Sequence, residues 1–206
     1  FAETHQIPVV ETIAGRANLR WDHSLNCGPL GVTGSDSANN LADKADVVLC
    51  VGTRLQDFTT GSWTVFGEST QLIKINPGRH DALKHQGHEV IAGAKESLPP
   101  LSEILGEYRA PAGWLDTAAS EREAWAVIRA ANTDINSGPN RYAQAIGVVN
   151  ALCDAGDRVV TAAGGLPAEV TANWRTLQES TVDVEFGFSC MGYEIAGGWG
   201  ARIAQS

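Results

Sequence analysis

The sequence predicts an α/β fold with parallel sheets, and three observations support this prediction. Short apolar runs at residues 46–52, 71–76 and 157–161 are typical of strands bounded by turn residues. The first run is continuously apolar and ends in glycine, which is typical of a strand covered by helices on both faces. Helical patterns separate the runs along the chain, and such alternation is typical of α/β proteins.

The elements near the start of the chain follow from local signals. Residues 7–10 form a short apolar run that predicts a strand. Residues 15–35 are rich in Gly, Asn, Pro and Ser, which predicts a long loop. Ser35 or Asp36 can then cap a helix that ends near Ala45, because a short side-chain oxygen accepts a hydrogen bond from an unpaired helix amide.

Strands and a helix are predicted after this point. The strand at 46–52 contains Cys50, which we expect to be a small core residue. Further strands are predicted at 71–76 and 88–92. A helix follows, and Pro99 with Pro100 would be tolerated only near its first turn. Its apolar residues recur at helical spacing and are Leu98, Leu101, Ile104 and Leu105.

The composition changes after residue 108, and we expect a linker at 109–138. Within it, residues 114–131 are rich in Ala and Glu and predict a helix with Trp114 and Trp125 as its large anchors. Pro139 then fits the first turn of a new helix. The apolar residues of that helix recur at helical spacing and are Tyr142, Ile146, Val149 and Cys153.

The last part of the chain repeats the strand and helix alternation. After the strand at 157–161, residues 164–167 predict a sharp turn into a helix that carries Trp174, and 182–186 predict another strand. The fold class is therefore α/β, with two incomplete Rossmann-like parallel-sheet domains joined by a helical linker. The expected divisions are 1–108, 109–138 and 139–206.

Composition and charge exclude several classes of protein. The net charge is −9, whereas a nucleic-acid binder needs a basic face, so we expect no nucleic-acid partner. No apolar run is long enough to cross a membrane. The chain opens on Phe1 without a Met and closes on Ser206 inside a helical pattern, so we expect it to be a piece of a longer protein.

The cysteines and histidines give no clear metal signal. No two of the four cysteines have metal-binding or redox-motif spacing, which favours a reducing, cytoplasmic setting. His80, His85 and His88 form the one histidine cluster, and no carboxylate or cysteine accompanies them at ligand spacing. We interpret the cluster as a polar surface turn rather than a metal site.

Three segments could carry chemistry, and each also has a purely structural interpretation. Gly164 and Gly165 follow a strand, where glycines let a backbone approach an anion at the next helix, or simply make a tight turn. Residues 52–57 follow another strand, and there Arg54 and Asp57 could bind a ligand or pair with each other.

The third segment, residues 186–200, is rich in small residues. Gly192, Ala196, Gly200 and Ala204 recur every four residues, which on a helix permits close approach of another helix, a ligand or the chain's own sheet. Each helix glycine costs roughly 1 kcal/mol relative to alanine, so packing or function must favour them.

These segments resemble known proteins. The run at 45–54 and the Ile75-Asn76-Pro77 sequence resemble the central domain of thiamine-diphosphate enzymes of the acetolactate synthase type. Residues 161–167 and 186–200 resemble the opening of the diphosphate-binding domain in that family, and most of all in its ring-opening acylhydrolases. The resemblance implies an enzyme that uses thiamine diphosphate as an electron sink to cleave a carbon–carbon bond of a small cyclic polyol dione.

The resemblance also implies roles for particular residues. The cofactor-binding residues would be Gly164, Gly165, Leu166, Ser189, Met191 and Gly192. Met191 matches the apolar residue that supports the bent cofactor between its two rings, and the carbonyl of Ser189 would receive the aminopyrimidine amino group. Gly164, Gly165 and Leu166 would approach the diphosphate. Because the turn offers Leu166 and Pro167 instead of polar side chains, those contacts would come mainly from the backbone.

Other parts of the family's site are expected outside these residues. The Mg²⁺ ligands are expected downstream of Ser206, and the catalytic glutamate in an N-terminal domain, so the chain alone is expected to be inactive. The resemblance implies a homodimer or homotetramer. Two alternatives remain open: a carboligase or decarboxylase like acetolactate synthase, and a non-catalytic module that binds a nucleotide such as FAD or ADP.

Overall fold

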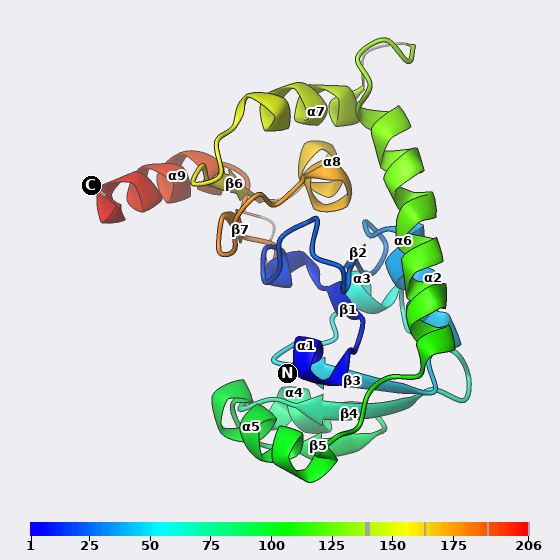
Figure 1. The fold of residues 1–206 in the computed structure, drawn as a ribbon. Coiled ribbons are helices and arrows are strands. Elements are labelled where there is room, and N and C mark those ends of the chain that lie inside the picture. The colour runs from blue at the N-terminus through cyan, green and yellow to red at the C-terminus, as the bar shows by residue number, and fades with distance from the viewer. Residues whose placement is uncertain (139–140, 163, 189, 206) are drawn as a thin grey trace.

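The computed structural model describes residues 1–138, 141–162, 164–188 and 190–205. Its helices and strands alternate along the chain (Figure 1). In order they are α1 (Ala2–His5), β1 (Val9–Glu11), the 3-10 helix η1 (Ile13–Gly15), β2 (Asn26–Pro29), α2 (Asp36–Lys44), β3 (Val47–Val51), α3 (Asp57–Thr60), β4 (Gln71–Ile75), α4 (Arg79–Leu83), β5 (His88–Val90), α5 (Ala94–Leu105), α6 (Ala112–Thr133), α7 (Tyr142–Leu152), β6 (Val159–Thr161), α8 (Gly165–Asn173), β7 (Val182–Val184) and α9 (Tyr193–Ala204).

The described strands form three small sheets, and every pair is parallel. β1 pairs with β2, β3–β4–β5 form a three-stranded sheet, and β6 pairs with β7. The α/β class with parallel sheets is therefore confirmed. All the strands that the sequence predicts are present, within about two residues at each end.

The expectation of one long loop at 15–35 is wrong, because β2 lies within it. Val9 pairs with Asn26 and Glu11 with Pro29, with a register irregularity between the two pairs. The strand has no alternating apolar pattern, and its Gly28 has a φ of +90°. Pairing with β1 creates this strand, so the local sequence carried no signal for it.

The expectation that residues 46–52 form a strand buried on both faces is also wrong. Cys50 is buried as predicted, in a cluster with Leu55 and Leu72. The strand's ends are open, with Val47 52% and Val51 37% exposed. The reason is that β3 is an edge strand among the described residues, and no residue of α5, the helix that follows β5, is buried.

Helix boundaries follow the predicted signals in some places and not in others. Ser35 caps α2, since its Oγ accepts a hydrogen bond from the amide of Ala38 at 3.2 Å. Pro99 and Pro100 lie inside α5 rather than in its first turn, because the helix begins earlier, at Ala94. Trp174 ends α8 as its C-cap instead of lying within the helix.

The predicted helix at 114–131 is present as α6, and it runs along one side of the molecule (Figure 1). Ala118 of this helix is buried against Cys27 and Leu41, with Trp114 packed beside them. The helix at 141–153 begins at Tyr142, so the expectation for Pro139 lies outside the described residues. Of its predicted apolar residues, only Ile146 is buried, in a cluster with Val170 and Trp174.

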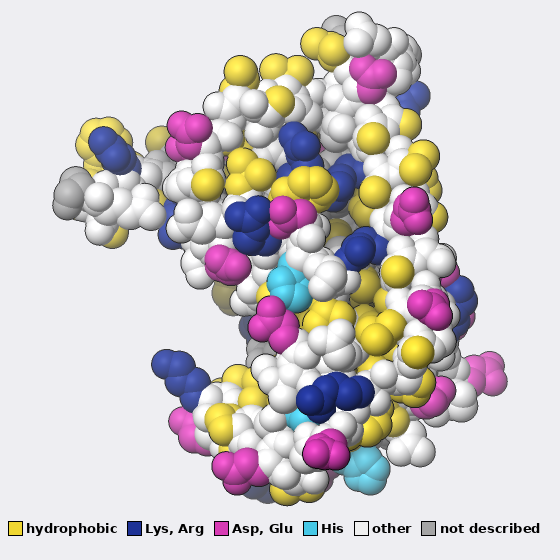
Figure 2. Space-filling model, in the orientation of Figure 1, with side chains coloured by type: hydrophobic (Ala, Val, Ile, Leu, Met, Phe, Trp, Pro, Cys, Tyr) yellow, Lys and Arg dark blue, Asp and Glu magenta, His cyan; other side chains and the backbone are white. Residues whose placement is uncertain are grey.

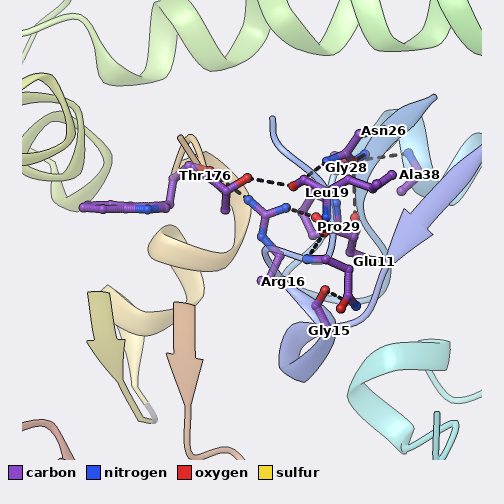
Figure 3. Close-up of polar contacts among 12 residues, drawn as sticks. Glu11, Gly15, Arg16, Leu19, Asn26, Gly28, Pro29, Ala38 and Thr176 are labelled. Atoms are coloured by element: carbon purple, nitrogen blue, oxygen red, sulfur yellow. Dashed lines mark hydrogen bonds and ion pairs between the residues drawn. The ribbon is translucent and has the colours of Figure 1, made fainter. Parts of the chain in front are cut away.

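A buried polar cluster joins the first part of the chain to the segment after α8 (Figure 3). Arg16 forms an ion pair with Glu11, and both side chains are nearly inaccessible to solvent. Its second amino group donates to the carbonyl of Trp174 at 2.7 Å. The hydroxyl of Thr176 donates to the carbonyl of Leu19 at 3.1 Å. Residues far apart in the sequence are thus held together by polar contacts in a dry environment.

No helix within the described part of the chain is long and apolar enough to cross a membrane.

Candidate functional site

The pairing of β6 with β7 brings two of the predicted site segments to one edge of a sheet. Thr161 lies opposite Val184, and the amide of Glu185 donates to the carbonyl of Thr161 at 3.0 Å. Because the strands are parallel, the Gly164–Gly165 turn and the segment from Phe186 onward both leave from the carboxyl end. This edge is where open α/β sheets bind ligands.

Gly164 makes the turn from β6 into α8. Its φ of 119° and ψ of −170° lie in a region that is essentially restricted to glycine. No side chain caps α8, and Pro167 has no N–H. The start of the helix therefore offers the N–H groups of Gly165 and Leu166, together with the positive end of the helix dipole. An anion is the group that such a helix start binds.

The carboxylate of Glu185 organises the turn after β7. It accepts hydrogen bonds from the amides of Phe188 at 3.0 Å and Cys190 at 2.7 Å. These bonds stabilise the charged form and hold the pKa of Glu185 below its ordinary value. Glu194 acts similarly one turn later, accepting from the amide of Gly192 at 2.9 Å. Neither glutamate could be identified from a sequence motif, because their roles depend on backbone geometry.

The other predicted cofactor residues lie on or beside this turn. Met191 is 86% exposed, and Gly192 has a φ of 96° as the N-cap of α9. Leu166 is 43% exposed on the first turn of α8. Ser189 lies outside the described residues. The structure thus presents Leu166 and Met191 at the surface near the carboxyl edge of β6 and β7.

The loop after β3 lies next to the turn after β7. The Phe58 and Phe186 rings meet edge to face with centroids 5.2 Å apart. The guanidinium of Arg54 lies 3.7 Å from the position that a Cβ on Gly187 would occupy. Pairing of Arg54 with Asp57, one of the two interpretations, is wrong for the described residues: Asp57 instead accepts a hydrogen bond from Ser62 at 3.0 Å.

An apolar pocket of about 480 Å³ lies under the Gly164 turn, with Leu166 and Glu194 in its lining. Most of its lining comes from α7, β6 and α8, and the lining includes Val170 and Trp174. A pocket of this size and polarity is suited to a small organic ligand.

The stripe of small residues is not covered by the chain's own sheet. Ala196, Gly200 and Ala204 are exposed, and a Cβ built on Gly198 or Gly200 would meet no atom within 4 Å. Burial against the chain's own sheet, one interpretation of this pattern, is therefore wrong for these described residues.

Within the described ranges, no group of three or more His, Cys, Asp or Glu side chains could hold a metal ion. In the histidine cluster, the ring of His85 packs on Trp63 with centroids 3.8 Å apart, and His80 is exposed. Burial and the nearby cations Lys84 and Lys74 lower the pKa of His85.

The chain is similar to one described protein family and to several curated proteins. Residues 1–101 match the family described as "Thiamine pyrophosphate enzyme, central domain". Among curated relatives, a 3D-(3,5/4)-trihydroxycyclohexane-1,2-dione hydrolase from Bacillus anthracis is 36% identical over 231 residues, covering 100% of this chain and 36% of that protein. A protein of the same name from Geobacillus thermodenitrificans is 34% identical over 229 residues, covering 100% of this chain and 35% of the relative.

A third relative, from Bacillus cereus, carries the name 3D-(3,5/4)-trihydroxycyclohexane-1,2-dione hydrolase 1 and is 36% identical over 231 residues. The chain spans about 36% of the length of the curated relatives that it matches. The similarity extends beyond residue 101, through α6 and the segments that carry Gly164 and Met191.

Proposed function

We propose that residues 1–101 form a thiamine pyrophosphate enzyme central domain, whose family they match, and that the chain is part of a thiamine-diphosphate-dependent hydrolase. Its substrate would be trihydroxycyclohexane-1,2-dione. The observation that carries this proposal is the similarity of the whole chain to hydrolases of that name, which includes the Gly164 turn and the Met191 turn.

The proposed reaction adds one water across a carbon–carbon bond of the ring. The bond next to one carbonyl breaks, the acyl carbon becomes a carboxylate, and the product is the open-chain 5-deoxyglucuronate of myo-inositol degradation. Thiamine diphosphate, when bound, supplies the electron sink that such a cleavage needs.

The residues at the carboxyl edge of β6 fit a diphosphate. The N–H groups of Gly165 and Leu166 would donate to it, and the positive φ of Gly164 leaves room for a close approach. Only two such donors are present in the first turn, because Pro167 has no N–H. The described residues do not form a cation site, so Mg²⁺ would need ligands from elsewhere in the protein.

The turn after β7 would contact the rest of the cofactor. Met191 and Gly192, with Ser189 before them, would hold the two rings in their bent arrangement. Glu185 and Glu194 would position this turn through its backbone amides, without touching the cofactor. In this assignment, 1–108 form the end of the central domain, 109–138 link the domains, and 139–206 begin the diphosphate-binding domain.

The proposal includes a cytoplasmic location and an oligomeric state for the enzyme. All four cysteines are free thiols, which fits a reducing, cytoplasmic compartment. A homodimer or homotetramer would bring a catalytic glutamate from a second subunit to the cofactor. The exposed Leu166 and Met191 support a site completed by other parts of the protein.

The test uses the complete protein encoded by the reading frame that contains these residues. Purified protein is incubated with thiamine diphosphate, Mg²⁺ and either trihydroxycyclohexane-1,2-dione or pyruvate, and the products are identified by mass spectrometry. We expect an acid one water heavier than the dione, and no acetolactate. Met191→Gly should lower kcat/KM at least tenfold, whereas Ile104→Gly, which alters an exposed apolar residue of α5, should not.

Acetolactate formed from pyruvate, with no turnover of the dione, would assign the protein to the carboligases instead. Turnover of the dione that persists after complete removal of thiamine diphosphate would refute the assigned cofactor.

A further inference from the structure

An arginine-rich pocket lies where the segment between β1 and β2 meets α6 and the end of α8. It has a volume of about 410 Å³, and its lining includes Arg16, Arg122, Arg129, Trp21 and Trp125. In Figure 2, Lys and Arg side chains gather in the hollow beside α6. This pocket, which we call the arginine pocket, is distinct from the apolar pocket under the Gly164 turn.

Part of the positive charge of the arginine pocket is neutralised by nearby carboxylates. Arg16 is paired with Glu11, and Asp22 of the lining is paired with Arg20 at 2.8 Å. Among the described residues, Arg122 donates to the backbone carbonyls of His23 and Ser24 alone, which carry no net charge. The remaining acid of the lining, Glu123, is exposed and pairs with none of the described arginines.

Arg129 of the lining and Arg175 outside it share the ring of Trp21. The guanidinium of Arg129 lies 4.8 Å from the ring centroid and that of Arg175 lies 5.5 Å from it. Neither side chain forms an ion pair or hydrogen bond with a described residue. Burial lowers the pKa of Arg129, and the neighbouring charges of Arg175 and Arg16 lower it further. Desolvated cations that face one another are unfavourable unless an anion joins them.

We propose that the arginine pocket binds a phosphate dianion, either inorganic phosphate or the phosphate group of a small ester. Arg129 would be the principal ligand, because its fork of N–H donors is free and matches phosphate oxygens. Contact with Trp21 holds the guanidinium plane of Arg129 in place. Arg122 adds positive charge in the lining, and Arg175, which is not in the lining, adds it from the same tryptophan ring. The pocket is within the size range of small-ligand sites.

The test measures phosphate binding by isothermal titration calorimetry and by the shift in Tm, at constant ionic strength, with inorganic phosphate and with glycerol 3-phosphate. Any ligand that binds only the folded state raises the Tm. We expect Arg129→Gln to weaken binding at least tenfold and Arg175→Gln to weaken it several-fold. Arg79→Gln changes an exposed arginine on α4 outside the pocket and should leave binding unchanged.

The melting temperature without ligand separates a binding role from a structural one. Removing one of several facing cations should leave the Tm of Arg129→Gln unchanged or higher, while its phosphate-induced shift is lost. Tighter binding of the ester than of phosphate would identify an ester as the occupant, and equal or weaker binding would identify free phosphate.

Absence of binding by both probes, or equal binding by wild-type protein and Arg129→Gln, would overturn the proposal. Neither probe involves thiamine diphosphate, so this outcome is independent of the proposed hydrolase activity.

Discussion

At the scale of single residues, the candidate site depends more on backbone geometry than on side-chain chemistry. Gly164 is needed for its φ of 119°, and Glu185 acts on the amides of Phe188 and Cys190. The sequence nominated the glycine, because glycine after a strand is a recognisable signal. It could not nominate the glutamate, because nothing in a local pattern shows which amides a carboxylate will meet.

Gly164→Ala should destabilise the protein by about 1–3 kcal/mol, because a Cβ is strained in this backbone region. Chemical denaturation followed by circular dichroism measures the change. Gly156→Ala is the matched control, since Gly156 has no positive φ and open space around its Cβ position, and should change stability little. Equal effects of the two substitutions would contradict the assigned strain.

The turn after β7 should loosen in acid. The pKa of Glu185 is lowered by the folded-state hydrogen bonds from Cys190 and Phe188, so its contribution is present above the unfolded pKa and disappears as the pH falls through the folded one. In an NMR titration, the amide shifts of Phe188 and Cys190 should change together with a midpoint below the ordinary glutamate value. Glu185→Gln should abolish this shared transition, and its persistence would assign the titration to another group.

At the scale of elements, caps and partners set where helices and strands form. α2 begins where the sequence predicts, because the Ser35 cap is a local signal. β2 was missed, since it depends on pairing with β1. The position of the strand at Val47–Val51 was predicted correctly. Its burial was predicted wrongly, because burial depends on which other elements pack on the sheet.

Ser35→Ala should destabilise the protein by about 1 kcal/mol or somewhat more. The substitution removes the cap of α2 and also the hydroxyl that donates to the carbonyl of Pro29 at 3.2 Å, at a fully buried position. Thermal unfolding measures the loss. Ser69→Ala, at an exposed turn position, should be close to neutral, and a comparable loss there would contradict the capping argument.

At the scale of the whole molecule, a buried arginine joins distant parts of the chain through an ion pair and a hydrogen bond. Arg16 links Glu11 on β1 to the carbonyl of Trp174 after α8. Its guanidinium is desolvated, which lowers its pKa despite the partner carboxylate. Breaking such a pair leaves an uncompensated buried charge, whereas replacing both partners by apolar residues can be nearly neutral.

A double-mutant cycle tests this linkage. Glu11→Leu and Arg16→Met should each destabilise the protein by about 3–5 kcal/mol, and the double variant should lose clearly less than the sum. Denaturant titrations give the four free energies of unfolding. Additive losses would show that the two side chains act independently.

The sequence by itself determined the α/β class, the parallel strands, the α2 cap and the α6 helix, because periodicity, apolar runs and turn residues are local signals. It also singled out Gly164 and Met191. The tertiary structure alone decided that β1 pairs with β2, that Val47 is exposed, and that Arg129 and Arg175 share one tryptophan ring. Those outcomes depend on contacts between segments as far apart as Trp21 and Arg175, and no local pattern records which distant charges and surfaces will meet.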